Sequence, residues 1–142
     1  MKRLLIIDID SLMHASPWPM LEKVPADASA GFVFRPELRR DWQKILANAV
    51  FYRGNAMGTL IADRLARALL KNVSRKQKYH IDQIIPFYLL QSDGKKAVEH
   101  IYPLPSTISS LDYAEDAAFW TAKGVNKRSE KFQSLQTVHL SE

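Results

Sequence analysis

The sequence predicts an α+β fold formed by one domain that spans residues 1–142. Three observations support this prediction. The length is that of a single ordinary domain. The hydrophobic fraction of 46% is typical of a globular protein with a buried core. Apolar residues recur at strand spacing in some segments and at helix spacing in others. Together these segments predict a small sheet, made of an N-terminal strand and a β-hairpin, packed against about three α-helices.

The N-terminal segment predicts a buried strand followed by a long loop. Residues 4–7 form a short apolar run, Leu-Leu-Ile-Ile, that stops at Asp8 and Asp10. These two acids interrupt the run, so it does not form the apolar core of a signal peptide. No stretch of the chain reaches the ~20 apolar residues of a membrane span. Residues 16–31 contain three prolines and have no period, which predicts a loop. We therefore expect a soluble, cytoplasmic protein.

Two consecutive helices are predicted after this loop. Pro36 suits the first turn of a helix, where its missing N–H would be unpaired anyway. From there to Gly54, apolar residues recur at steps of three and four, as on the buried stripe of an amphipathic helix. The residues of this stripe are Leu38, Trp42, Ile45, Ala49 and Tyr52. A second helix begins near Ala56. Its predicted core stripe is Met57, Leu60, Ile61, Leu65, Ala68 and Leu69.

The second half of the chain predicts a hairpin and one more helix. Residues 81–90 are apolar enough for a strand, at a sheet edge or a bulge because Pro86 cannot donate to a ladder. Asp93-Gly94 is typical of a hairpin turn, and residues 97–102 would form the return strand. Ser109 or Ser110 would cap a third helix that ends at Gly124. Residues 135–140 alternate partly and are compatible with a last strand.

Basic residues are concentrated in one part of the chain. Residues 35–78 carry eleven Lys and Arg against three acids, a net charge of +8, whereas the rest carries nine against twelve, or −3. On one pair of helices such a surplus creates a positive field that attracts polyanions. We expect a small basic nucleic-acid-binding or regulatory protein, without cofactor and without catalytic residues. The candidate nucleic-acid-binding residues are Arg39, Arg40, Arg64, Arg67, Lys71, Arg75, Lys76 and Lys78.

Asp8 and Asp10 support an alternative function. Residues i and i+2 of a strand point to the same side, and paired carboxylates can hold Mg²⁺ together with a phosphate. Residues 4–12, Leu-Leu-Ile-Ile-Asp-Ile-Asp-Ser-Leu, resemble the opening strand of haloacid-dehalogenase-type phosphatases, in which Gly and Thr commonly follow the second Asp. The segment is also similar to the opening of 5′-nuclease and PIN-type nucleases. The resemblance implies a Mg²⁺-dependent nuclease or phosphohydrolase with Asp8 and Asp10 as metal ligands. Further acids would have to converge on them, and the candidates are Asp63, Asp93, Glu115 and Asp116.

A third hypothesis is a protein-protein interaction module, such as an inhibitor or an assembly subunit. An acidic protein surface would satisfy the same positive charge as a nucleic acid, so DNA, RNA and protein all stay open as partners. An exposed aromatic patch would favour this hypothesis, because aromatic and Arg side chains dominate interface energetics. The chain contains no cysteine, which excludes disulfides, zinc-thiolate sites and thiol nucleophiles.

Overall fold

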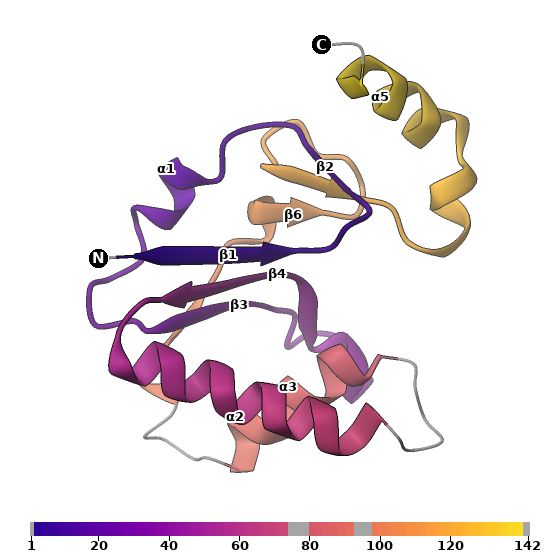
Figure 1. The fold of residues 1–142 in the computed structure, drawn as a ribbon. Coiled ribbons are helices and arrows are strands. Elements are labelled where there is room, and N and C mark those ends of the chain that lie inside the picture. The colour runs from indigo at the N-terminus through magenta and orange to yellow at the C-terminus, as the bar shows by residue number, and fades with distance from the viewer. Residues whose placement is uncertain (1, 74–79, 93–97, 141–142) are drawn as a thin grey trace.

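A computed structural model describes residues 2–73, 80–92 and 98–140, and it confirms the α+β class. Strands and helices follow one another in an irregular order along the chain (Figure 1). The strands are β1 (Arg3–Ile7), β2 (Ser11–Met13), β3 (Ala30–Phe34), β4 (Ile45–Arg53), β5 (Ile101–Pro103), β6 (Ser109–Ser110) and β7 (Phe119–Thr121). The helices are α1 (Trp18–Leu21), α2 (Ala56–Val73), α3 (Ile81–Ser92) and α5 (Glu130–Leu140), with short 3-10 turns η1 (Asp41–Gln43), η2 (Ser106–Ile108) and η3 (Gly124–Arg128).

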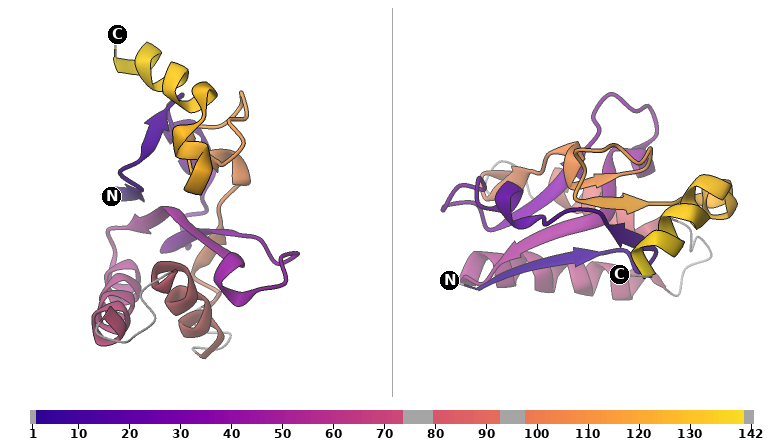
Figure 2. Two further views of the ribbon diagram at one scale, coloured as in Figure 1. Left: turned by 90° about the vertical axis from the view of Figure 1, so that its right-hand side faces the viewer. Right: turned by 90° about the horizontal axis from the view of Figure 1, so that it is seen from above.

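The strands form two small sheets. The first has the order β1-β4-β3-β5, antiparallel except for the β3–β5 pair, and the second has the order β2-β7-β6. Helices α2 and α3 lie side by side on one face of the first sheet, and the second sheet lies on the other side (Figures 1 and 2). β4 therefore sits between two core layers. The layer under the helices contains Phe32, Ile45, Val50, Tyr52, Ile61 and Leu65, and the layer on the other side contains Leu21, Val33, Phe51, Leu104 and Ile108.

The predicted first helix is wrong, because residues 45–53 form the interior strand β4. A strand that is buried on both faces reads as a nearly continuous apolar run. An irregularity in the pairing with β3, between Phe32 and Val33, shifts the alternation within β4. As a result Ile45 and Tyr52 face the helices while Ala49 faces the other core layer. The spacing of three and four residues between Ile45, Ala49 and Tyr52 is therefore that of a strand buried on both faces with a register shift, and not that of a helix.

The second predicted helix is confirmed as α2. Asn55 caps it, since its Oδ1 accepts a 2.7 Å bond from the backbone N–H of Gly58. Ile61 and Leu65 are buried against the sheet, as the apolar stripe predicted. Leu60 is an exception to that stripe, because it is 49% exposed on the outer side of the helix.

The remaining predicted elements need correction. Residues 81–92 form helix α3 around a buried Pro86, where packing against α2 and β4 overrides the strand preference of the apolar run. The predicted turn at residues 93–95 lies outside the described residues. The predicted return strand overlaps only β5, which pairs parallel with β3 and not antiparallel with residues 81–90. The predicted third helix, from Ser109 or Ser110 to Gly124, is wrong, because these residues form β6, β7 and the turns between them. Residues 135–140 belong to α5.

The N-terminal strand is present but it is not buried. β1 is an edge strand, and Leu4, Ile6 and Ile7 are 56%, 49% and 38% exposed. The apolar run predicts a buried strand, and this prediction is wrong, because the position of a strand in the sheet order depends on pairing with distant segments.

Candidate functional site

Three of the predicted basic residues share the outward side of α2. Ile61 and Leu65 point into the core, and with about 3.6 residues per turn Arg64, Arg67 and Lys71 lie together on one exposed flank of the helix, which we call its outward side. All three are exposed. Asp63 binds one of them, with its Oδ2 accepting a 2.7 Å bond from Arg67 Nε, and this pairing raises the pKa of Arg67. The outward side of α2 therefore carries three exposed cations, with Asp63 as the acid beside them.

Arg39 and Arg40 do not lie on the helix pair. They are exposed in the connection between β3 and β4, just before η1. Helix α3 packs against both α2 and η1 and lies between them in Figure 2. The two arginines thus form a basic group separate from the outward side of α2. The candidates Arg75, Lys76 and Lys78 fall outside the described residues.

Two other basic residues of segment 35–78 are used inside the fold. Arg53 donates to backbone carbonyls of the preceding loop, with Nε 2.8 Å from the oxygen of Ala28 and Nη2 2.9 Å from the oxygen of Pro25. Arg35 is half-buried, and this burial lowers its pKa. The charge of +8 counted along the segment consequently overstates the charge that α2 and its surroundings present to a partner.

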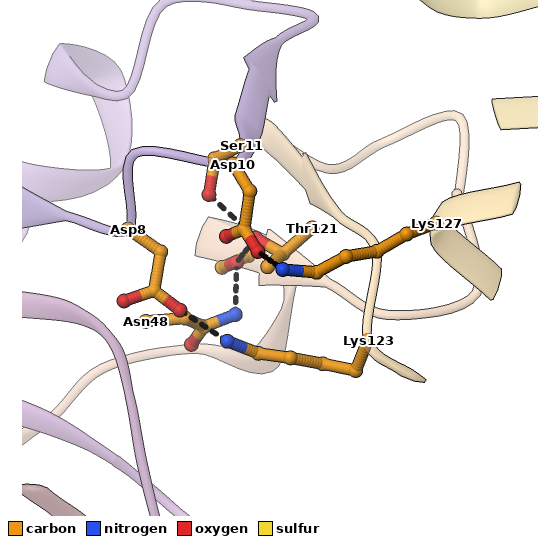
Figure 3. Close-up of polar contacts among 8 residues, drawn as sticks. Asp8, Asp10, Ser11, Asn48, Thr121, Lys123 and Lys127 are labelled. Atoms are coloured by element: carbon orange, nitrogen blue, oxygen red, sulfur yellow. Dashed lines mark hydrogen bonds and ion pairs between the residues drawn. The ribbon is translucent and has the colours of Figure 1, made fainter. Parts of the chain in front are cut away.

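The predicted acidic pair, Asp8 and Asp10, forms a second polar site with two lysines. β1 ends at Ile7, so both acids lie in the turn that leads to β2. Lys123 donates to Asp8 Oδ2 and Lys127 donates to Asp10 Oδ2 (Figure 3). The lysines come from η3 and the residue before it, more than a hundred positions along the chain. We call these four residues the Asp–Lys cluster.

A buried chain of polar side chains lies beside the Asp–Lys cluster. Asn48 Nδ2 donates to Ser109 Oγ at 2.6 Å, and Thr121 Oγ1 shares hydrogen bonds with Ser109 Oγ at 3.1 Å and with Ser11 Oγ at 2.7 Å. Asn48, Ser109 and Thr121 are only 2%, 3% and 0% exposed. The chain joins β4 of the first sheet to all three strands of the second (Figure 3). It therefore fixes how the two sheets meet.

Electrostatics favour the charged forms of Asp10 and Lys127. Burial raises the pKa of Asp10, but the hydrogen bond from Lys127 and the charges of Lys123 and Lys127 outweigh it, so that this pKa is lowered overall. Asp10 in turn raises the pKa of Lys127. Two carboxylates face two ammonium groups, and the cluster has no surplus charge to attract a phosphate.

The residues around Asp8 and Asp10 do not fit a magnesium site. Mg²⁺ takes oxygen ligands in octahedral geometry, whereas each of these carboxylates already binds an ammonium group. Among residues 2–73, 80–92 and 98–140, no group of three or more His, Asp or Glu side chains could hold a metal. Of the further acids, Asp63 pairs with Arg67 on α2 and Asp93 lies outside the described residues. Within the described residues, no set of acids that a nuclease would need is gathered at the turn.

Sequence reasoning missed half of this second site. Asn48 had a readable signal, because an amide in the middle of the apolar run of residues 45–52 is unusual in a buried strand. Nothing in the sequence marks Lys123 and Lys127 as site residues, because their spacing is that of any exposed lysines and their partners, Asp8 and Asp10, are far away in the sequence.

No helix in the described part of the chain is long and apolar enough to cross a membrane. Comparisons of the chain with protein-family models and with curated proteins find no match, so its own residues must carry any functional assignment.

Proposed function

We propose that this protein binds nucleic acid through the outward side of α2, with Arg64, Arg67 and Lys71 contacting phosphates. The observation that supports the proposal is the grouping of these three exposed cations on one side of an 18-residue helix. Phosphate contacts supply the sequence-independent part of nucleic-acid affinity, and they require exposed cationic donors.

The spacing of the three cations suits a phosphate backbone. At about 1.5 Å of rise per residue, Arg64 and Lys71 are roughly 10 Å apart along the helix axis. Duplex DNA presents about six phosphates over the same length, at one charge per ~1.7 Å. Three cations on a rigid helix can therefore meet phosphates without rearrangement of the backbone.

Binding of this kind must depend strongly on salt. Each neutralised phosphate contributes about 0.9 to the slope of log affinity against log salt for duplex DNA, and about 0.7 for single strands. Three contacts thus predict a slope contribution of roughly 2–3. Arg39 and Arg40 would add a separate contribution from their own position, which a double substitution of these two residues measures independently.

The test is the variant R64E/R67E/K71E, titrated with labelled single- and double-stranded DNA and RNA at several salt concentrations. Its matched control is K23E/R128E/K131E, which changes the net charge by the same amount at exposed positions away from α2. We expect the α2 variant to bind weakly with a slope reduced by roughly 2–3, and the control to keep most of its slope. Equal losses in the two variants, or unchanged binding in the first, would refute the proposal.

An acidic protein surface is the competing partner. Polyglutamate added as a competitor distinguishes the two, since it offers carboxylates in place of phosphates. Competition by polyglutamate as strong as that by unlabelled nucleic acid would favour the interaction-module hypothesis. The absence of a magnesium fit at Asp8 and Asp10 leaves hydrolysis without support, and intact products on a gel after incubation with Mg²⁺ would agree with that.

A further inference from the structure

The outer edge of β1 is unpaired within the described part of the chain. β1 is the first strand in the order β1-β4-β3-β5, and β4 is its one strand partner there. Figure 2, seen from above, shows β1 along the margin of the sheet. Its side chains Leu4 and Ile6 are 56% and 49% exposed. Exposed apolar edges of this kind pair readily with another strand.

The hydrogen bonds to β4 determine which backbone groups of β1 face outward. Lys2 O accepts from Gly54 N at 2.8 Å, and Asp8 N donates to Asn48 O at 3.2 Å. In an antiparallel ladder, hydrogen-bonded and non-hydrogen-bonded residues alternate. The even-numbered residues of β1 therefore bond to β4, and the odd-numbered ones point their N–H and C=O groups away from it. These outward-pointing residues are Arg3, Leu5 and Ile7.

The apolar surface of β1 continues onto one flank of α2. Thr59 and Ala62 of α2 line a groove of about 420 Å³ together with Leu4 and Ile6 of β1. With about 3.6 residues per turn, the same flank continues through three further apolar residues. These are Ala66, Leu70, which is 74% exposed, and Val73, which is 54% exposed. The basic side of α2 faces elsewhere, so this flank is uncharged.

We propose that β1 pairs antiparallel with β1 of a second copy of the chain, forming a two-fold symmetric dimer. In a two-fold antiparallel pair of identical strands, the residues that hydrogen-bond across the pair must lie opposite one another. Here these are the odd-numbered residues of β1, because their backbone N–H and C=O groups point away from β4. The register with the greatest overlap places Leu5 opposite its own counterpart. Leu4 then lies opposite Ile6 of the other copy.

In this register Lys2 lies opposite Asp8 of the second copy, whose carboxylate also binds its own Lys123. The complementarity between the two copies is therefore mainly apolar, because Leu4 meets Ile6 on both sides of the two-fold axis. The two four-stranded sheets become one continuous sheet, and the apolar α2 flanks approach each other on the same face. Self-complementarity of this kind is what a two-fold interface requires, and it favours a second copy over an unrelated strand.

The first test measures the mass in solution by light scattering over a range of protein concentrations. We expect the wild type to have the mass of two chains and the variant L4K/I6K, which places lysines opposite one another, to have the mass of one. The matched control is Leu60→Lys, at a residue 49% exposed like Ile6 but on the outer side of α2, and it should stay dimeric. A monomeric wild type, or a dimer that L4K/I6K leaves intact, would overturn the proposal.

The second test reads the register directly and does not need a destabilising change. The chain has no cysteine, so introduced thiols are the sole ones. In the proposed register, the Cα atoms of Leu4 and Ile6 of the other copy are about 4.5 Å apart, within the range of a disulfide. Two Leu4 positions are roughly 8 Å apart, beyond that range.

A mixture of L4C and I6C chains should therefore cross-link under mild oxidation, and L4C alone should not. Circular dichroism checks that both variants fold as the wild type does. Failure of the mixture to cross-link, or cross-linking of L4C alone to the same extent, would refute the register and with it the dimer. Neither test involves nucleic acid, so their outcome is independent of the proposed function.

Discussion

Removal of the Thr121 hydroxyl should destabilise the protein by about 2–3 kcal/mol. The side chain is 0% exposed, and its hydroxyl bonds to Ser11 Oγ at 2.7 Å and to Ser109 Oγ at 3.1 Å. Valine has nearly the same shape, so Thr121→Val deletes both hydrogen bonds without a large cavity. Each lost bond costs about 1 kcal/mol, and the buried Ser109 hydroxyl, left with Asn48 as its partner, adds up to about 1 kcal/mol more. Ser11 is half-buried, and water can replace its lost partner in part.

Urea denaturation followed by tryptophan fluorescence measures this loss. Trp120 adjoins Thr121 in β7 and is 7% exposed, so its emission reports unfolding of the second sheet. The wild type and the variants are compared at one protein concentration, because a dimer makes the midpoint depend on concentration. Thr137→Val is the control. It removes an exposed hydroxyl that donates to Gln133 O, and it should change the stability by less than about 0.5 kcal/mol. A loss below about 0.5 kcal/mol for Thr121→Val would refute the structural role of the polar chain.

Three further predictions concern the packing of α2 and the titration of two sites. Gly58→Ala should destabilise the protein by about 1–3 kcal/mol, because the added Cβ would lie 2.1 Å from Arg53 O. In an open helix the same change would stabilise by about 1 kcal/mol. Thermal unfolding measures the effect, and a higher melting temperature than that of the wild type would contradict the close packing. The Asp10–Lys127 pair contributes stability near neutral pH. In the folded protein the pKa of Asp10 is below its ordinary 3.8, so this stability is lost as pH falls through that lowered pKa. The folded pKa of Lys127 is above its ordinary 10.5, so the stability is also lost as pH rises through that raised pKa. In urea titrations, the difference in unfolding free energy between wild type and Asp10→Asn should therefore be constant between the ordinary pKa values of 3.8 and 10.5, and it should shrink below and above them. A difference that does not depend on pH would argue against the pair. Burial raises the pKa of Tyr52 to about 12, so stability should fall as pH rises from 10 toward 12, and this decline should be smaller in Tyr52→Phe; an equal decline in the two proteins would show that Tyr52 ionises normally.

Helix α2 could be predicted because its determinants are local. Its apolar stripe from Met57 to Leu69 repeats over more than three turns, its cap Asn55 directly precedes it, and its basic residues follow the same period. For the same reason the outward position of Arg64, Arg67 and Lys71 was readable from spacing alone, and the structure places them as that spacing predicted.

Strand β4 and helix α3 were misread because local patterns there are ambiguous. β4 has core on both faces and a shift in its alternation, so it lacks the period of two that marks a half-buried strand. α3 is rich in residues that favour strands and contains Pro86, and it is helical because α2 and β4 provide a surface for it.

The sequence alone determined the α+β class, helix α2 and the side of that helix on which its charge lies, since all of these depend on residues within a few turns of one another. Only the tertiary structure decided that β1 is an edge strand and that Asp8 and Asp10 bind Lys123 and Lys127. The partners of these acids, and of Ser11, are more than a hundred residues away along the chain. Contacts over such distances follow from strand order and register, which depend on how all segments share one core and which no single segment encodes.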